Sequence, residues 1–112
     1  MKYIIKGDFY TDDDFSIRID NFDKEFQSCI QFDRPYYSVF LETNTIYKAQ
    51  SFLEQLMVSF DVIWTHHYLL PDLYGIVDKM YEALLDKNQD CASDYLSGNY
   101  DGTEISLVKV AE

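Results

Sequence analysis

The sequence contains few histidines, which are common in metal sites and acid–base active sites. Its only histidines are His66 and His67, and neighbouring residues on a helix or turn do not face one another, so they cannot chelate a metal alone. A catalytic zinc site would need further ligands, such as Asp61 or Asp72. Imidazoles near the end of a helix, where positive charge is favourable, are the preferred interpretation. We therefore expect no metal site.

Glycine, proline and cysteine are equally scarce. With four glycines and two prolines, the chain has no glycine-rich phosphate loop and no nucleophile elbow. Cys29 and Cys91 lie far apart without the spacing of a redox or metal motif, so both are expected to be free thiols, buried or half-buried. These absences predict a protein that is not an enzyme, with no catalytic residues and no cofactor.

Basic residues and long apolar runs are also missing. Nine Lys and Arg stand against twenty Asp and Glu, which gives a net charge of −11. This charge argues against direct binding to nucleic acid or to an anionic membrane, and it favours a basic protein as partner. No apolar run is long enough to span a membrane, and the first residues are too polar for a signal peptide, so a cytoplasmic location is expected.

Aromatic residues, in contrast, are abundant. Ten Tyr, eight Phe and one Trp are more large rings than one small core easily holds, so some are expected at the surface, where they favour interfaces. A hydrophobic content of 47% is normal for a folded protein. The length of 112 residues fits one domain covering 1–112.

The stretch from Thr45 to Asn88 carries the two long helical patterns. At about 100° per residue, two sets of apolar residues each fall on one helix face. The first helix ends near Trp64, and Pro71 suits the first turn of the second. A connection of roughly six residues predicts an antiparallel helical hairpin. The two faces comprise Ile46, Ala49, Phe52, Leu53, Leu56, Met57, Phe60, Ile63 and Trp64, then Leu73, Ile76, Val77, Met80, Tyr81 and Leu84.

Strand predictions rest on alternating hydrophobicity and on the turn signals between segments. The turn-rich Gly7–Asp14 predicts an antiparallel hairpin between the first two strands. The segment Asn21–Asp33 fits both helix and strand, and strand is slightly favoured. The segment Gln89–Gly102 is expected to be irregular. The predicted strands are Lys2–Lys6, Phe15–Asp20, Tyr36–Glu42, which follows a tight connection at Arg34-Pro35, and Glu104–Val110.

Strands, then two helices, then a strand predict an α+β domain. A mainly antiparallel sheet of four to five strands would carry the two-helix hairpin on one face, and its other face would be at least partly open. Tyr36 and Phe40 fall on the side of their strand opposite Tyr37, Val39 and Leu41. Either both sides of this strand are covered, or Tyr36 and Phe40 are exposed to a partner.

One acidic group lies on the second helix. Asp78, Glu82 and Asp86 repeat at i, i+4 and i+8, so they would line one helix face despite mutual repulsion. Four residues of helix rise by about 6 Å, which is close to two nucleotide steps along one DNA strand. This line of carboxylates would therefore imitate phosphates toward a basic groove. A solvated acidic face without a partner is the alternative.

A second acidic group is Asp12, Asp13 and Asp14, which follow Asp8. The alternating ligands, central glycine and closing glutamate of a calcium loop are missing here. A solvated turn is preferred, because Asp favours turns. The group is also a candidate part of an acidic contact surface.

Tyr47, Val58 and Val62 fall on the polar side of the first helix. Single exposed apolar residues are ordinary, so these three need no special role. Alternatively, and preferred, they form the seam of a homodimer or contact the C-terminal segment. Homodimerisation therefore remains an alternative mode of association.

Size and charge together resemble those of phage-encoded inhibitors of nucleic-acid enzymes, including anti-CRISPR and DNA-mimic proteins, and of bacterial immunity proteins against basic nucleases. The resemblance covers no motif. It implies an acidic inhibitor that binds a basic partner, such as a nuclease, through Asp78, Glu82, Asp86, Asp12, Asp13, Asp14, Tyr36 and Phe40. A structural or accessory homodimer without inhibitory activity is the alternative function.

Overall fold

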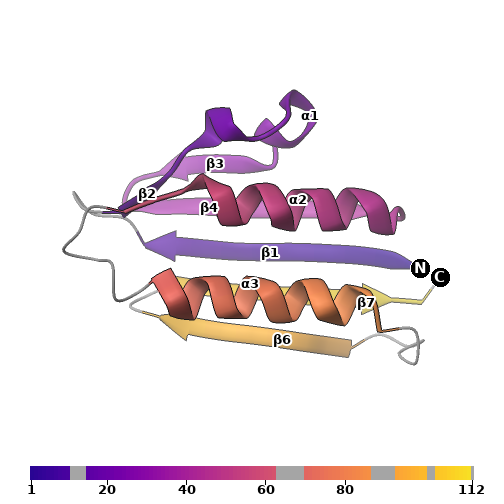
Figure 1. Cartoon of the computed structure of the whole chain (residues 1–112). Coiled ribbons are helices and arrows are strands. Elements are labelled where there is room, and N and C mark those ends of the chain that lie inside the picture. Colours follow the sequence, from indigo (N-terminus) through magenta and orange to yellow (C-terminus); the bar gives the residue numbers. More distant parts are fainter. Residues whose placement is uncertain (11–14, 63–69, 87–92, 101–102, 112) are drawn as a thin grey trace.

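The computed structural model describes residues 1–10, 15–62, 70–86, 93–100 and 103–111. It has a five-stranded antiparallel sheet in the order β3-β4-β1-β7-β6, with two long helices side by side over one face (Figure 1). The α+β fold class is therefore confirmed. The sheet strands are β1 (Lys2–Tyr10), β3 (Ile30–Asp33), β4 (Tyr36–Thr43), β6 (Ser93–Tyr100) and β7 (Thr103–Val110), and the long helices are α2 (Ile46–Ser59) and α3 (Leu70–Leu84).

Strand β1 lies at the centre of the sheet with both of its edges paired. Ile5 is opposite Leu41 of β4 on one side and opposite Leu107 of β7 on the other, and all three side chains are buried. Inward-facing apolar residues continue to Phe9, which is fully buried. The strand therefore extends well past Lys6, where the predicted strand ended.

The predicted hairpin between the first two strands is wrong. The second strand, β2 (Phe15–Ile17), pairs with β5 (Phe60–Val62) in a separate two-stranded sheet, and the 3-10 helix η1 (Ile19–Asn21) follows it. Because β4 and β7 occupy both edges of β1, no edge of β1 is left for β2. Of the predicted turn Gly7–Asp14, residues 7–10 belong to β1, and residues 11–14 lie outside the described residues.

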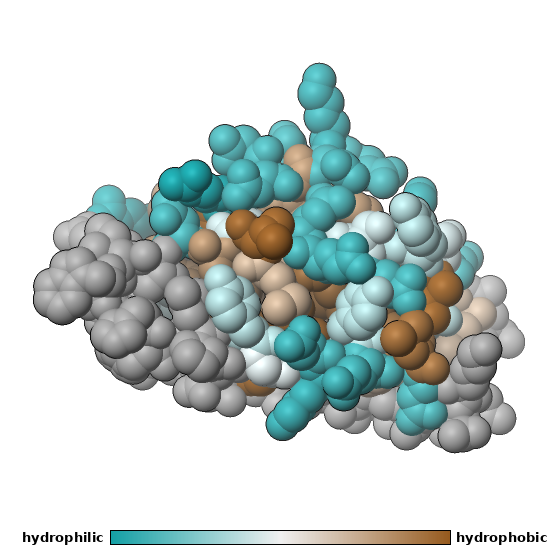
Figure 2. Space-filling model, viewed as in Figure 1, coloured by the Kyte–Doolittle hydropathy of each residue, from teal (hydrophilic) through white to brown (hydrophobic). Residues whose placement is uncertain are grey.

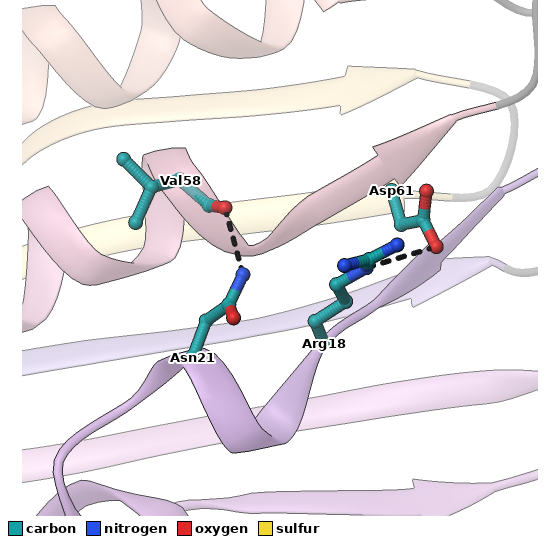
Figure 3. A network of polar contacts seen from close by, with 4 residues as sticks. All are labelled: Arg18, Asn21, Val58 and Asp61. Atoms are coloured by element: carbon teal, nitrogen blue, oxygen red, sulfur yellow. Dashed lines mark hydrogen bonds and ion pairs between the residues drawn. The ribbon is translucent and has the colours of Figure 1, made fainter.

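Helix α2 ends at Ser59, earlier than the sequence pattern indicates. Backbone groups at its end are bonded to the segment after β2. The Arg18 backbone N–H donates to the Ser59 carbonyl oxygen at 2.7 Å. Figure 3 shows Asn21 Nδ2 donating to the Val58 carbonyl oxygen at 3.1 Å, and Arg18 Nε donating to Asp61 Oδ2 at 3.1 Å. These contacts hold the chain extended as β5 directly after the helix.

The connection between the helices is therefore longer than the six residues expected, and it contains β5. Ile63 and Trp64, predicted to be helical, lie outside the described residues. The apolar helix faces themselves are confirmed, since they bury side chains against the sheet. The buried residues are Ala49, Phe52, Leu53 and Leu56 of α2 and Leu73, Ile76, Val77, Met80 and Leu84 of α3.

The ambiguous segment Asn21–Asp33 contains both types of structure. A short helix α1 (Lys24–Gln27) precedes β3, so the preference for strand was correct only for its last residues. Phe22 precedes this helix and Phe26 lies in it. Each packs on Phe52 of α2 with ring centroids 5.4 Å apart. Aromatic contacts at such distances stabilise beyond simple burial, and they dock this segment onto α2.

The tight connection at Arg34 and Pro35 is confirmed, since it joins β3 to β4 and contains a cis peptide bond. The prediction of an irregular Gln89–Gly102 is wrong. Its residues 93–100 form β6, which pairs with β7 from Ser93 to Tyr100. An edge strand is held by backbone hydrogen bonds to one neighbour, and these leave little trace in side-chain hydrophobicity.

Lys109 interrupts the apolar inward face of β7. Its side chain is 1% exposed, and its Nζ donates to the Asp86 carbonyl oxygen at 3.0 Å, just beyond α3. Desolvation by burial lowers the pKa of Lys109, and the Asp86 charge opposes this shift. A cation at this position is also favoured by the negative end of the α3 dipole.

Two glycines provide a matched test of this packing. A Cβ on Gly7 of β1 would lie 2.6 Å from the Glu104 carbonyl oxygen of β7, whereas a Cβ on Gly75 of α3 would meet nothing within 4 Å. Gly7→Ala should therefore destabilise the fold by about 1–3 kcal/mol. Gly75→Ala should stabilise it by about 0.5–1 kcal/mol, because alanine favours a helix interior. Urea unfolding measures both, and a Gly7→Ala variant of unchanged stability would contradict this strand packing.

Candidate functional site

The residues predicted to contact a partner do not form one surface. Phe40 is opposite Lys6, and Tyr36 is opposite Tyr10, on the face of the sheet that no described helix covers. Helix α3 lies on the other face of the sheet (Figure 1). Its residues Asp78 and Glu82 are exposed there. The predicted rings and the predicted carboxylates are thus separated by the thickness of the sheet.

The predicted line of three carboxylates is shortened by the end of α3. The helix stops at Leu84, so Asp86 does not continue the helical repeat of Asp78 and Glu82. The Asp86 backbone carbonyl oxygen instead accepts the hydrogen bond from Lys109. Asp86 therefore lies beyond the helix that carries Asp78 and Glu82, and its place in a line of three carboxylates stays a prediction.

The other predicted acidic group, Asp12, Asp13 and Asp14, lies outside the described residues, as do His66 and His67. Within the described part of the chain, no group of His, Cys, Asp and Glu is arranged to hold a metal ion. Cys29 is a free, partly buried thiol, and burial raises its pKa, with a further increase from the charge of Glu25. A raised pKa keeps this thiol protonated and unreactive.

Between α2 and α3 the structure brings together a tyrosine and three carboxylates. Tyr81 Oη of α3 donates to Glu54 Oε1 of α2 at 3.1 Å. At about 100° per residue, Asp78, Tyr81 and Glu82 fall within an arc of roughly 100° on α3. Glu54, Asp78 and Glu82 are exposed, and Tyr81 is partly exposed. We call these four residues the acidic helix surface.

The three carboxylates of the acidic helix surface form no ion pair with a described basic residue. The described ion pairs are Lys2–Glu42, Arg18–Asp61 and Lys48–Glu25. Among the described residues, none of Glu54, Asp78 and Glu82 lies within ion-pair distance of a basic group. Figure 2 shows that this side of the molecule is largely hydrophilic, with hydrophobic residues in separate spots instead of one continuous patch. A charged partner suits such a surface better than an apolar one.

The uncovered sheet face has a different character. Its exposed rings are Phe40, 53% exposed, Tyr10, 43%, and Tyr36, 37%, and the rings of Tyr10 and Tyr36 meet edge to face with centroids 5.7 Å apart. Ile4 of β1 and Val108 of β7 are opposite each other on the same face, nearer the other end of the strands, and both are partly exposed. We call this the open face. Of the two alternatives for Tyr36 and Phe40, the one with both sides of the strand covered is wrong, because both rings are exposed.

Two members of the acidic helix surface escaped the sequence analysis. Tyr81 lies at the margin of the apolar stripe of α3 and was assigned to the core, although its hydroxyl points to Glu54. Glu54 of α2 was not among the predicted site residues, because its contact is with a residue of another helix. The one available signal was a tyrosine at the margin of a stripe, where a polar tip often reaches solvent.

Tyr47 and Val58, the exposed apolar residues predicted on α2, are 72% and 67% exposed. They therefore do not dock on the C-terminal segment, and the side chain of Val62 lies outside the description. No helix among the described residues combines the length and apolar character needed to cross a bilayer. Comparison with protein-family models, with curated proteins and with solved structures gave no match.

The bond to Glu54 raises the pKa of the Tyr81 phenol, with smaller contributions from desolvation and the Glu54 charge. The raised pKa means that this bond supports the fold fully below about pH 10, the usual tyrosine value, and is lost as the pH rises through the higher folded-state pKa. In an ultraviolet absorbance titration, Tyr81→Phe should remove a phenol that ionises late. Glu54→Gln should shift that phenol to lower pH. An unchanged titration in Glu54→Gln would contradict the bond.

Proposed function

We propose that this chain is a non-enzymatic binding protein that places its acidic helix surface on a basic surface of another protein and blocks it. The supporting observation is the cluster of Glu54, Asp78 and Glu82 around Tyr81, none of which forms an ion pair with a described basic residue. The net charge of −11 acts in the same direction, because it attracts a basic partner over a longer distance.

The four residues supply complementary contacts for a cationic side chain. An arginine that approaches Tyr81 would meet carboxylates of both α2 and α3. Its guanidinium would also lie against the ring of Tyr81, a cation–π contact of about 0.5–1 kcal/mol at an exposed site. The charge–charge contacts mainly accelerate association and select the partner, and the ring contact adds affinity.

Nucleic-acid enzymes are the class of partner that this proposal favours, since they bind phosphates through clusters of lysine and arginine. Asp78 and Glu82 are four residues apart, which is a rise of about 6 Å along the helix axis. This rise is close to two nucleotide steps along one DNA strand, about 6.8 Å of axis. The chain would thus act as an inhibitor of the DNA-mimic, anti-CRISPR or nuclease-immunity type. With Asp86 beyond the helix, this imitation rests on two carboxylates of α3 and on Glu54 of α2.

A structural or accessory homodimer without inhibitory activity is the alternative. The exposed rings of the open face favour such an interface, but they give no role to the acidic helix surface. Salt separates the two functions, because screening weakens a charge-steered complex much more than an apolar contact.

Capture from a lysate of the source organism, followed by mass spectrometry, would identify the partner. We expect a basic protein that elutes as salt is raised. The variant Glu54→Gln/Asp78→Asn/Glu82→Gln should bind this protein at least about 10-fold more weakly, since several charge contacts are lost at once. Isothermal titration calorimetry with the purified partner measures the change in Kd.

The matched control is Asp20→Asn/Glu25→Gln/Asp33→Asn, which also removes three negative charges from exposed positions, but away from α3. This control should retain most of the affinity at moderate salt. Equal weakening by both variants would mean that net charge alone acts, and unchanged affinity in both would remove the acidic helix surface from the proposal. If the partner is a nuclease, addition of the wild-type chain should also slow its cleavage of DNA.

A further inference from the structure

We propose that the open face is the interface of a homodimer, in which β1 of one copy lies antiparallel over β1 of the other. The first support is the group of rings on this face, where Phe40, Tyr10 and Tyr36 are between 37% and 53% exposed. On a chain that is otherwise strongly acidic, rings gathered on one uncovered sheet face are typical of a protein interface.

The charges on this face identify the occupant as a second copy. Lys6 lies on one half of the face, and Asp8 and Glu104, which are directly opposite each other, lie on the other half. Lys2 is paired with Glu42 at 3.2 Å, whereas Lys6 has no ion pair among the described residues. A surface that is positive at one end and negative at the other is complementary to itself after a two-fold rotation.

A two-fold axis that crosses β1 between Lys6 and Asp8 brings opposite charges of the two copies together. It places Lys6 of each copy over Asp8 of the other, because the rotation reverses the strand direction. By the same rotation Phe40, which is opposite Lys6, meets Ser38, which is opposite Asp8, and Ile4 meets Tyr10. Each contact occurs twice, as in any isologous interface.

The area of the face is sufficient for a stable dimer. Strands about 4.8 Å apart with a rise of about 3.3 Å per residue give the four long strands and the four-residue β3 a footprint of ~600 Å² per copy. The total of ~1,200 Å² reaches the size of specific interfaces. The dimer leaves both acidic helix surfaces on the outside, so it goes beyond the proposed function and neither requires nor prevents it.

Sedimentation equilibrium of the full chain across a wide concentration range tests the dimer directly. We expect a monomer–dimer equilibrium that persists at high salt, since the long-range repulsion between two acidic copies is then screened. Phe40→Asp should raise the dimer Kd by roughly 30-fold, as expected for a central ring. Tyr47→Asp, which replaces an exposed ring of α2 with the same charge, should leave the dimer Kd within about twofold. Thermal unfolding should show that both variants fold.

A charge swap tests the orientation of the two copies. Lys6→Asp and Asp8→Lys should each weaken the dimer, because each places like charges together across the axis. The double variant Lys6→Asp/Asp8→Lys should restore it, because the pairs are reversed but intact. A wild-type chain that is monomeric at all concentrations would overturn the proposal. So would a dimer that Tyr47→Asp weakens and Phe40→Asp does not, or a double variant no tighter than either single one.

Discussion

The pairing of both edges of β1 is the constraint from which the rest of the architecture follows. A central strand with buried Ile5 and Phe9 needs backbone partners on each side, and β4 and β7 supply them. The inward side chains of these three strands then present one continuous apolar face, which α2 and α3 cover. The short strand β2 has no place beside β1 and pairs with β5, so the end of α2 is fixed by a segment that precedes it by some forty positions in the chain.

Hydrophobic periodicity correctly predicted the elements in which each side chain is either buried or exposed. The alternation of Val39 and Leu41 with Tyr36 and Phe40 assigned the two sides of β4 correctly, because each residue is either covered or not. The end of α2 could not be predicted in this way. The apolar arc continues through Phe60, but Arg18 and Asn21 bond the last carbonyls of the helix, and nothing in the local pattern marks these distant donors. Strand β6 was missed because backbone hydrogen bonds to β7 hold this edge strand, and these bonds leave little trace in the side-chain pattern.

The candidate site was predictable only where one helix contains it. The spacing of Asp78 and Glu82 sufficed to place both on the outer side of α3. Periodicity cannot decide, however, whether Tyr81 at the margin of the apolar stripe faces the core or the carboxylate of Glu54, which another helix provides. The opposite placement of these carboxylates and of Tyr36 and Phe40 depends on which sheet face the helices cover, and that is a property of the assembled fold.

The separation of charge and rings onto opposite faces has a physical consequence for association. Long-range attraction to a basic partner grows with net charge, and a dimer joined through the open faces would carry twice the charge of one chain while exposing both acidic helix surfaces. If the rings and the carboxylates shared one surface, two copies would repel each other at the same surface that attracts a basic partner. With the sheet between them, short-range ring contacts can hold two copies together while the carboxylates of α2 and α3 remain available to a cationic surface. In the proposed dimer the sheet would thereby let one small acidic chain satisfy two opposing electrostatic requirements.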